Sequence, residues 1–117
     1  METNYYIKVT KNYLRDLPCH QSALAIMQAG QHDSEEAVED LKRLKYHVSK
    51  IELCIAQLDQ EEREALLLHY GNKLAYADVA EEMHWSLRTC KRRVRKAIES
   101  IAFMLYGDKS KDGYRFV

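Results

Sequence analysis

The sequence has few of the residues that interrupt helices: its 117 residues include one proline and four glycines. It also has no apolar run that approaches the roughly 20 residues of a membrane-spanning helix. Because so few residues break the chain, helices are favoured over a fold of short strands and tight turns. We therefore expect an all-α fold with one modest core and no contact with a membrane.

Features that mark enzymes, metalloproteins and secreted proteins are missing as well. Three cysteines, an odd number, do not suggest a disulfide framework, and no pair of Cys or His residues has the spacing of a zinc site. There is no Gly-rich phosphate loop and no paired-carboxylate motif, so we expect neither an enzyme nor a bound cofactor. Residues 1–4 lack the charged start and apolar stretch of a signal peptide, which predicts a cytoplasmic protein.

The net charge is zero, but the charges are segregated along the chain. Residues 1–85 contain 9 Lys/Arg and 15 Asp/Glu, whereas residues 86–117 contain 9 Lys/Arg and 3 Asp/Glu. This asymmetry indicates one acidic surface and one basic surface, and a basic surface attracts phosphate groups.

Two short helices are predicted near the N-terminus, on either side of Pro18. The first runs from Thr10 to Leu17 and ends at the proline. The proline then suits the first turn of a second helix, which runs to Gln28 and stops near Gly30. The side chains expected to be buried in this pair are Leu14, Leu17, Leu24 and Met27.

A long helix is predicted to begin at its N-cap, Ser34, and to run to residue 57. Its apolar residues alternate between spacings of three and four: Leu41, Leu44, Val48, Ile51, Ile55 and Leu58. So narrow a stripe either packs on the protein's own short helices or forms a coiled-coil homodimer with a second copy. Packing within the chain is the preferred interpretation, because the stripe is shorter than the roughly three to four heptads of a coiled coil.

The second half of the chain predicts three more helices. One covers residues 60–70 and begins at a capping box formed by Asp59 and Glu62. A short helix covers residues 76–83 and a last helix residues 87–105, with a three-residue turn between them. Two helices joined by so short a turn are typical of a helix-turn-helix, whose second helix enters the major groove of DNA.

Gly107 ends the last helix, and the tail that follows is polar and is predicted to be mobile. Within the turn, Trp85 is expected to fill the corner between the helices and Ser86 to cap the last helix. The expected organisation is a helical segment, a DNA-binding domain and a tail, over residues 1–57, 58–107 and 108–117.

The last helix carries the strongest functional signal. Six of the eleven residues from 86 to 96 are basic and none is acidic. Their like charges repel one another along the helix, a cost that is explained if the partner is a polyanion. The alternative is a solvated basic face on an ordinary surface helix. The residues expected to bind double-stranded DNA are Arg88, Thr89, Lys91, Arg92, Arg93, Arg95 and Lys96.

Different roles are expected within this set. Contacts to base edges are expected from the residues in the first turns, Arg88, Lys91 and Arg92. Contacts to phosphates are expected from the later residues, Arg93, Arg95 and Lys96. The alternative for Arg93 is an ion pair with an acidic side chain of the domain body. Thr89 either touches a thymine methyl or a phosphate, or only supports the cap.

Two stretches resemble a known family: residues 58–71 (LDQEEREALLLHYG) and residues 76–97 (YADVAEEMHWSLRTCKRRVRKA). They are similar to the fourth region of sigma-70 family factors, and the resemblance extends from Leu58 to Leu105. It implies a four-helix domain that reads the −35 promoter element, with RNA polymerase as a partner. DNA contacts are implied at Arg88, Lys91 and Arg92, and a phosphate or structural role at Arg93.

Three residues depart from the family pattern: Asp78 stands for glutamate, His84 for a turn glycine and Cys90 for valine. A histidine in the place of that glycine is expected to need positive φ. The acidic cluster of Glu61, Glu62 and Glu64 is expected to be a solvated helix start, and its alternative role is a contact with RNA polymerase.

The layout also resembles a smaller group of proteins. A short helical segment followed by a sigma-like domain is similar to the phage late-gene regulators of the ArpU and RinA type. That resemblance implies an activator in the cytoplasm of a bacterial host cell, associated with the nucleoid. Two alternatives are a DNA-packaging protein such as a terminase small subunit, which would form a ring, and a module that binds only a sigma factor or RNA polymerase.

Overall fold

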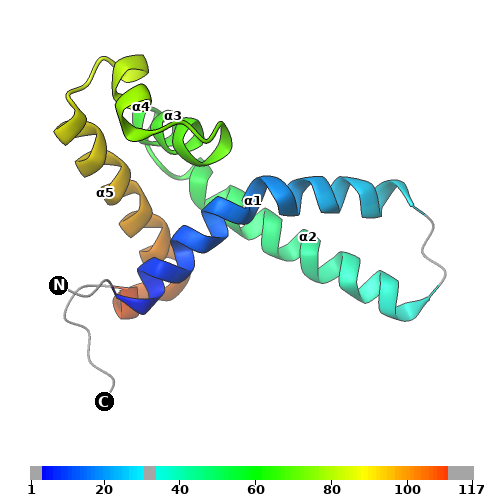
Figure 1. Cartoon of the computed structure of the whole chain (residues 1–117). Helices are drawn as coiled ribbons and strands as arrows, with labels where there is room; N and C mark the ends of the chain where they lie inside the picture. Colours follow the sequence, from blue (N-terminus) through cyan, green and yellow to red (C-terminus); the bar gives the residue numbers. More distant parts are fainter. Residues whose placement is uncertain (1–3, 31–33, 111–117) are drawn as a thin grey trace.

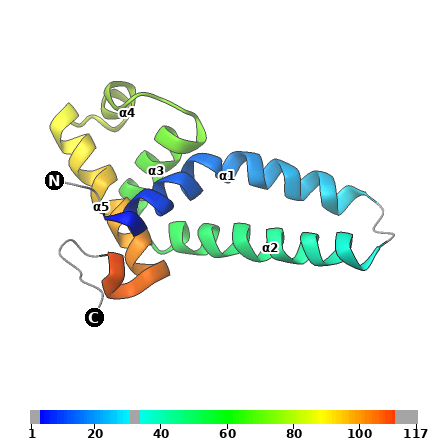
Figure 2. The same cartoon turned by 60° about the horizontal axis from the view of Figure 1, so that its bottom comes forward.

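The computed structural model describes residues 4–30 and 34–110, and every element within them is helical. The elements are α1 (Tyr5–Ala29), α2 (Glu35–Ala56), α3 (Gln60–Leu66), the π-helical turn η1 (Leu67–Gly71), α4 (Tyr76–Met83), α5 (Leu87–Tyr106) and the 3-10 turn η2 (Gly107–Ser110). Figure 1 and Figure 2 show α3, α4 and α5 together at one end of the molecule, from which α1 and α2 extend as a hairpin. The all-α prediction is confirmed. None of the helices described is both long enough and apolar enough to cross a membrane.

One helix, α1, replaces the two short helices that were predicted on either side of Pro18. It begins at Tyr5, where the Asn4 side chain accepts a hydrogen bond from the Tyr6 N–H (2.8 Å), and it continues through the proline to Ala29. A proline inside a helix removes one backbone donor and crowds the preceding turn, which bends a helix without always ending it. Figure 1 and Figure 2 show a bend near the middle of α1.

Packing explains why α1 continues through Pro18. Leu14 and Leu17, in the turns before Pro18, are 2% and 6% exposed. Leu24, in the turns after it, also packs against the core, although Leu24 and Met27 are half-buried rather than buried as predicted. Both halves of the helix therefore gain from contact with the rest of the protein, which offsets the lost hydrogen bond.

The apolar stripe of α2 faces the protein's own core. Ser34 caps the helix as predicted, since its Oγ accepts a hydrogen bond from the Ala37 N–H (3.1 Å). Val48 and Ile51 are each 1% exposed, whereas the first members of the stripe are half-buried. The stripe is therefore occupied by contacts within one chain, as the preferred interpretation predicted.

A single hydrophobic core joins the two halves of the chain. Its fully buried side chains come from all five α-helices: Leu14, Val48, Ile51, Leu66, Val79, Val94, Ile98 and Ile101. α5 lies at the centre of this core, because it contacts α1, α2, α3 and α4. The described part of the predicted helical segment, residues 4–30 and 34–57, thus shares its core with the predicted domain of residues 58–107.

The chain after Gly107 continues as an ordered turn. Residues 107–110 form η2, in which Ser110 is 5% exposed and donates a hydrogen bond from its Oγ to the Gly107 carbonyl (2.9 Å). The prediction of a mobile tail is therefore wrong for residues 108–110, because a buried hydroxyl and helix contacts hold them. The remainder of the predicted tail, residues 111–117, lies outside the described residues.

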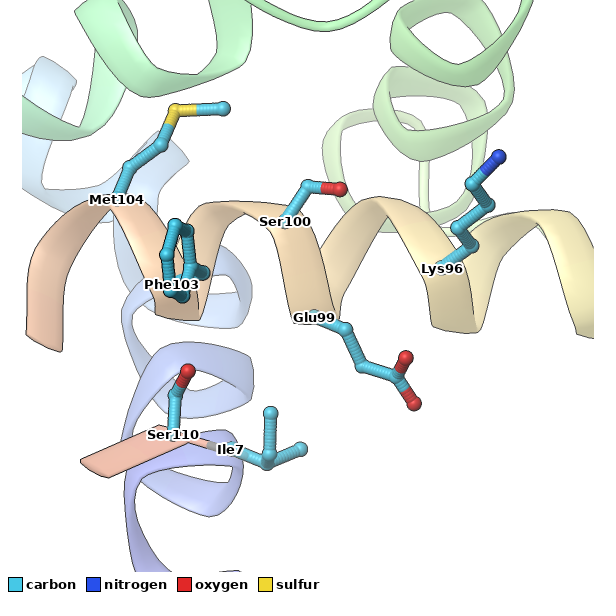
Figure 3. A pocket seen from close by; sticks show the side chains of 7 residues that line it. All are labelled: Ile7, Lys96, Glu99, Ser100, Phe103, Met104 and Ser110. Atoms are coloured by element: carbon cyan, nitrogen blue, oxygen red, sulfur yellow. The ribbon is translucent and has the colours of Figure 1, made fainter. Parts of the chain in front are cut away.

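η2 ties the end of α5 to the start of α1. The Asn4 side chain donates a hydrogen bond to the Lys109 carbonyl (3.0 Å), and the centroids of the Tyr6 and Tyr106 rings lie 4.9 Å apart. A hollow of about 520 Å³ lies at this junction. Figure 3 shows side chains that line it, with Ile7 of α1 beside Ser110 of η2 and Phe103 of α5. The start of α1 is thereby attached to the helix that carries the basic residues.

Two histidines and a tyrosine meet between α1 and α2. The centroid of the His47 ring lies 5.3 Å from that of His20 and 4.7 Å from that of Tyr13, both on α1. Burial lowers the pKa of His47 below its usual value of 6.5, and the positive charges of His20 and Lys50 lower it further. The folded state therefore favours the neutral ring of His47.

We expect the protein to lose stability as the pH falls below 6.5, the ordinary pKa of His47. Above that pH the ring is neutral in the folded and the unfolded chain, whereas below it the unfolded chain takes up a proton that the folded chain resists. The urea midpoint should be lower at about pH 5.5 than at about pH 7.5, and His47→Gln should reduce this difference. If the difference between the two urea midpoints is unchanged in the His47→Gln protein, His47 is not the source of the pH dependence.

Candidate nucleic-acid interface

α4 and α5 are joined by a turn of three residues, His84, Trp85 and Ser86, at the predicted place. His84 has φ 58° and ψ 38°, so the expected positive φ is confirmed. The Trp85 N–H donates a hydrogen bond to the Ala80 carbonyl (2.9 Å), and the Ser86 Oγ accepts one from the Thr89 N–H (3.1 Å). The turn thus ends one helix, starts the next and sets the angle between them.

Small and branched apolar side chains hold these two helices together. Val79 and Ala80 of α4 are 0% and 4% exposed, and Cys90 and Val94 of α5 are both 0% exposed. Trp85 is half-buried and packs against the same core, as predicted for the corner. Because this side of α5 is fully occupied by packing, the opposite side must face solvent.

That opposite side is the basic face of α5, which comprises the exposed residues Arg88, Lys91, Arg92, Arg95 and Lys96. Figure 1 and Figure 2 show the N-terminal half of α5 at the end of the molecule opposite the α1–α2 hairpin, where neither helix of the hairpin covers it. The major groove of DNA is wide enough to admit one α-helix. An exposed helix with charges of one sign suits that groove and the phosphates along its edges.

Two members of the basic face have acidic partners. The Arg95 Nε lies 3.0 Å from Oε1 of Glu99, and the Lys96 Nζ lies 3.9 Å from Oε1 of Glu62. Both basic side chains remain open to solvent, at 72% and 67% exposed. An exposed ion pair contributes little stability, so these two residues can exchange a carboxylate for a phosphate at low cost.

The three residues predicted to read bases lie together near the start of α5. Within the part of the chain that the structure describes, Arg88, Lys91 and Arg92 have no acidic partner. Each can therefore bind a base edge or a phosphate without first breaking an ion pair. Thr89 is half-buried beside them, and its Oγ1 accepts a hydrogen bond from the Ser86 Oγ (3.0 Å), so it supports the helix cap.

Arg93 stands apart from the basic face. Its side chain is only 24% exposed, and its guanidinium nitrogens lie 3.6–3.9 Å from carboxylate oxygens of Asp59, Glu61 and Glu62. The guanidinium also lies 5.0 Å from the centroid of the Trp85 ring, a cation–π contact. The structure therefore shows the ion pair with the domain body that was the alternative role of Arg93, and its phosphate contact stays a prediction.

Glu62 is the buried member of this acidic cluster, at 6% exposed. Its N–H donates a hydrogen bond to Asp59 Oδ1 (2.8 Å), which is the first half of the predicted capping box. Its own carboxylate turns toward Arg93 and Lys96. Burial and the charge of Asp59 raise the pKa of Glu62, and the two cations only partly offset that rise. The prediction of a solvated cluster is therefore wrong for this residue, although the two neighbouring glutamates are exposed.

No three His, Cys, Asp or Glu side chains in residues 4–30 and 34–110 are grouped so that they could hold a metal ion. Cys54 and Cys90 are buried and Cys19 is exposed. Burial raises the pKa of the Cys54 and Cys90 thiols, which disfavours the thiolate that a nucleophile or metal ligand needs. These two residues therefore act as small hydrophobic side chains in the core.

Comparison with known proteins identifies one family in this chain. Residues 49–101 match the family described as sigma-70, region 4. The matched range begins inside α2, ahead of the predicted boundary at Leu58, and contains α3, α4, the turn and α5 up to Ile101. No curated protein and no solved structure matches the chain.

We expect His84→Gly to stabilise the protein by about 1 kcal/mol, because glycine adopts positive φ without the steric cost of a Cβ atom. The His84 side chain is exposed, so little packing is lost. His84→Ala keeps the Cβ and serves as the control, with no gain expected. Urea unfolding of the three proteins measures the effect. Equal stability of the glycine and alanine variants would show that the left-handed conformation is not a constraint at this turn.

We expect Arg93→Ala to destabilise the protein by about 1–3 kcal/mol, because it removes one of the two cations beside the buried Glu62 carboxylate and leaves it with the exposed Lys96 alone. The matched control is Arg92→Ala, which removes the same atoms from an exposed position one residue earlier. This control should change the free energy of unfolding by less than about 0.5 kcal/mol. Equal losses from the two substitutions in urea unfolding would contradict a structural role for Arg93.

Proposed function

We propose that this protein, whose residues 49–101 form a helix-turn-helix domain of the sigma-70 region 4 type, is a sequence-specific regulator that activates transcription together with RNA polymerase. DNA binding in transcription is the function of that domain type. The observation that carries the proposal is the start of the basic face. There Arg88, Lys91 and Arg92 have no acidic partner among the described residues, on a helix whose other side is fully packed.

In the proposed complex the first half of α5 enters the major groove. Arg88, Lys91 and Arg92, which have no acidic partner among the described residues, contact base edges, where an arginine fork binds O6 and N7 of a guanine. Arg95 and Lys96 exchange their carboxylate partners for phosphates, and the backbone N–H groups at the start of the helix face another phosphate. Because each such contact releases counterions, the affinity falls steeply as the salt concentration rises.

The activating role and the polymerase contact are the finer part of the proposal. They are supported by the domain type and by the layout, in which a helical hairpin precedes a region 4-like domain. This layout is similar to that of phage late-gene regulators of the ArpU and RinA type. Such a regulator works in the cytoplasm of a bacterial host, at the nucleoid.

We expect selection from a random duplex pool to enrich one sequence motif with the wild-type protein. Arg92→Ala should lose about 1–3 kcal/mol of affinity for that motif, which is about 5- to 150-fold, and should relax the preference at one base position. Arg43→Ala is the matched control, because it removes an exposed arginine from the first half of α2, which lies at the opposite end of the molecule from the start of α5 (Figure 1). Its affinity and its motif should equal those of the wild type.

Three results would contradict the proposal. A pool without enrichment, combined with affinity lost at about 0.15 M salt, indicates binding to phosphates alone. If the protein has no affinity for duplex DNA even at low salt, the result favours the module that binds only protein. A ring of eight or more subunits with affinity for one viral packaging sequence favours a terminase small subunit.

A further inference from the structure

The hairpin of α1 and α2 ends in an arm, residues 18–30 and 34–47, that has no core of its own. None of the described residues between Leu17 and Val48 is buried. Apolar side chains between the two helices, such as Leu24 and Leu44, are half-buried. Helices this short are marginal in water unless tertiary packing covers an apolar face. The arm therefore gains stability from any partner that covers one of its outer sides.

The two outer sides of the arm differ sharply in charge. The α2 side is covered by exposed charged residues: Glu35, Glu36, Glu39, Asp40, Lys42, Arg43 and Lys45. On the α1 side, none of the chain's 18 Lys/Arg and 18 Asp/Glu lies in residues 17–32. Burying unpaired charges is costly, so the α2 side is suited to water and the α1 side to a protein contact.

Four of the exposed side chains of α1 in the arm define the uncharged face: Cys19, Ser22, Ile26 and Ala29. Their spacing of three and four residues puts them on one side of the helix. Ile26, near the middle of that side, is 73% exposed and is the most exposed of the large hydrophobic side chains described. An apolar side chain in such a position marks an interaction surface when its neighbours are uncharged as well.

The absence of charge also limits the partner. A nucleic acid requires a surface rich in Lys and Arg, and residues 17–32 contain neither. A partner surface rich in either sign would leave its own charges buried without counter-charges. The complementary surface is therefore itself uncharged and apolar, and the chain already has one such surface, namely the same face on a second copy. A two-fold dimer brings identical patches together in this way.

We propose that the arm is a dimerisation element, in which the uncharged face of α1 packs on the same face of a second copy to form a four-helix bundle. The contact differs from the coiled coil considered for the long helix, because the stripe of α2 is occupied within the chain. The use of the dimer rests on the proposed function: two copies present two basic faces to two half-sites of a DNA operator.

Sedimentation equilibrium over a range of protein concentrations tests the proposal on the full chain. The wild type should have twice the chain mass of 13.7 kDa. Ile26→Lys should have the mass of one chain, because it places an unpaired charge at the centre of the contact. The matched control is Leu53→Lys, at an apolar residue of α2 that is 64% exposed and lies outside the arm. This control should remain a dimer, and circular dichroism should show equal helix content in all three proteins.

A monomeric wild type, a dimeric Ile26→Lys protein, dissociation by Leu53→Lys, or a ring of more than two chains would each overturn the dimer. Selection from the duplex pool with the same samples tests the proposed function separately from the proposed dimer. A monomeric wild-type protein that enriches a motif would contradict the proposed dimer and support the proposed regulator. A dimeric wild-type protein without affinity for duplex DNA would contradict the proposed regulator and support the proposed dimer.

Discussion

Burial of one side of α5 is the constraint on which the rest of the structure depends. Cys90, Val94 and Ile101 are all 0% exposed, and α5 contacts each of the other four α-helices. Removing so much apolar surface from water is a large favourable term in folding. Because the residues on one side of a helix point away from those on the other, this packing also decides which residues of α5 face solvent. The basic face is therefore held in place by the core behind it.

The same helix carries two kinds of arginine, and the surroundings decide their roles. Arg92 points to solvent, where a cation can meet a polyanion. Arg93, the next residue, lies about 100° further around the helix, over Trp85 and beside three carboxylates. Without Arg93 the buried Glu62 would keep only the exposed Lys96 as a cationic partner, so Arg93 joins the start of α3 to α5. One residue of sequence thus separates an exposed basic side chain from an internal ionic contact.

Much of the fold could be predicted from the sequence because the signals are local. The caps at Ser34 and Ser86, the short helix over residues 76–83 and the positive φ of His84 each depend on a few neighbouring residues. Predictions failed where distant packing outweighs a local preference. Pro18 does not end a helix whose two halves both pack on the core, and residues 108–110 are held by contacts with the start of α1. No local pattern reports either contact.

The sequence by itself determined the helical class, the turn between α4 and α5 and the basic character of α5, since composition, caps and 3.6-residue periodicity encode them directly. Only the tertiary structure decided which cations are available. Arg88, Lys91 and Arg92 have no acidic partner among the described residues, whereas Arg93 is paired with acidic residues some thirty positions earlier in the chain. The tertiary structure also decided that the stripe of α2 is occupied and that the uncharged face of α1 is exposed. The physical reason is that a side chain can bind a partner only where the rest of the chain leaves it exposed. Which side chains are exposed depends on packing between segments that are distant in the sequence.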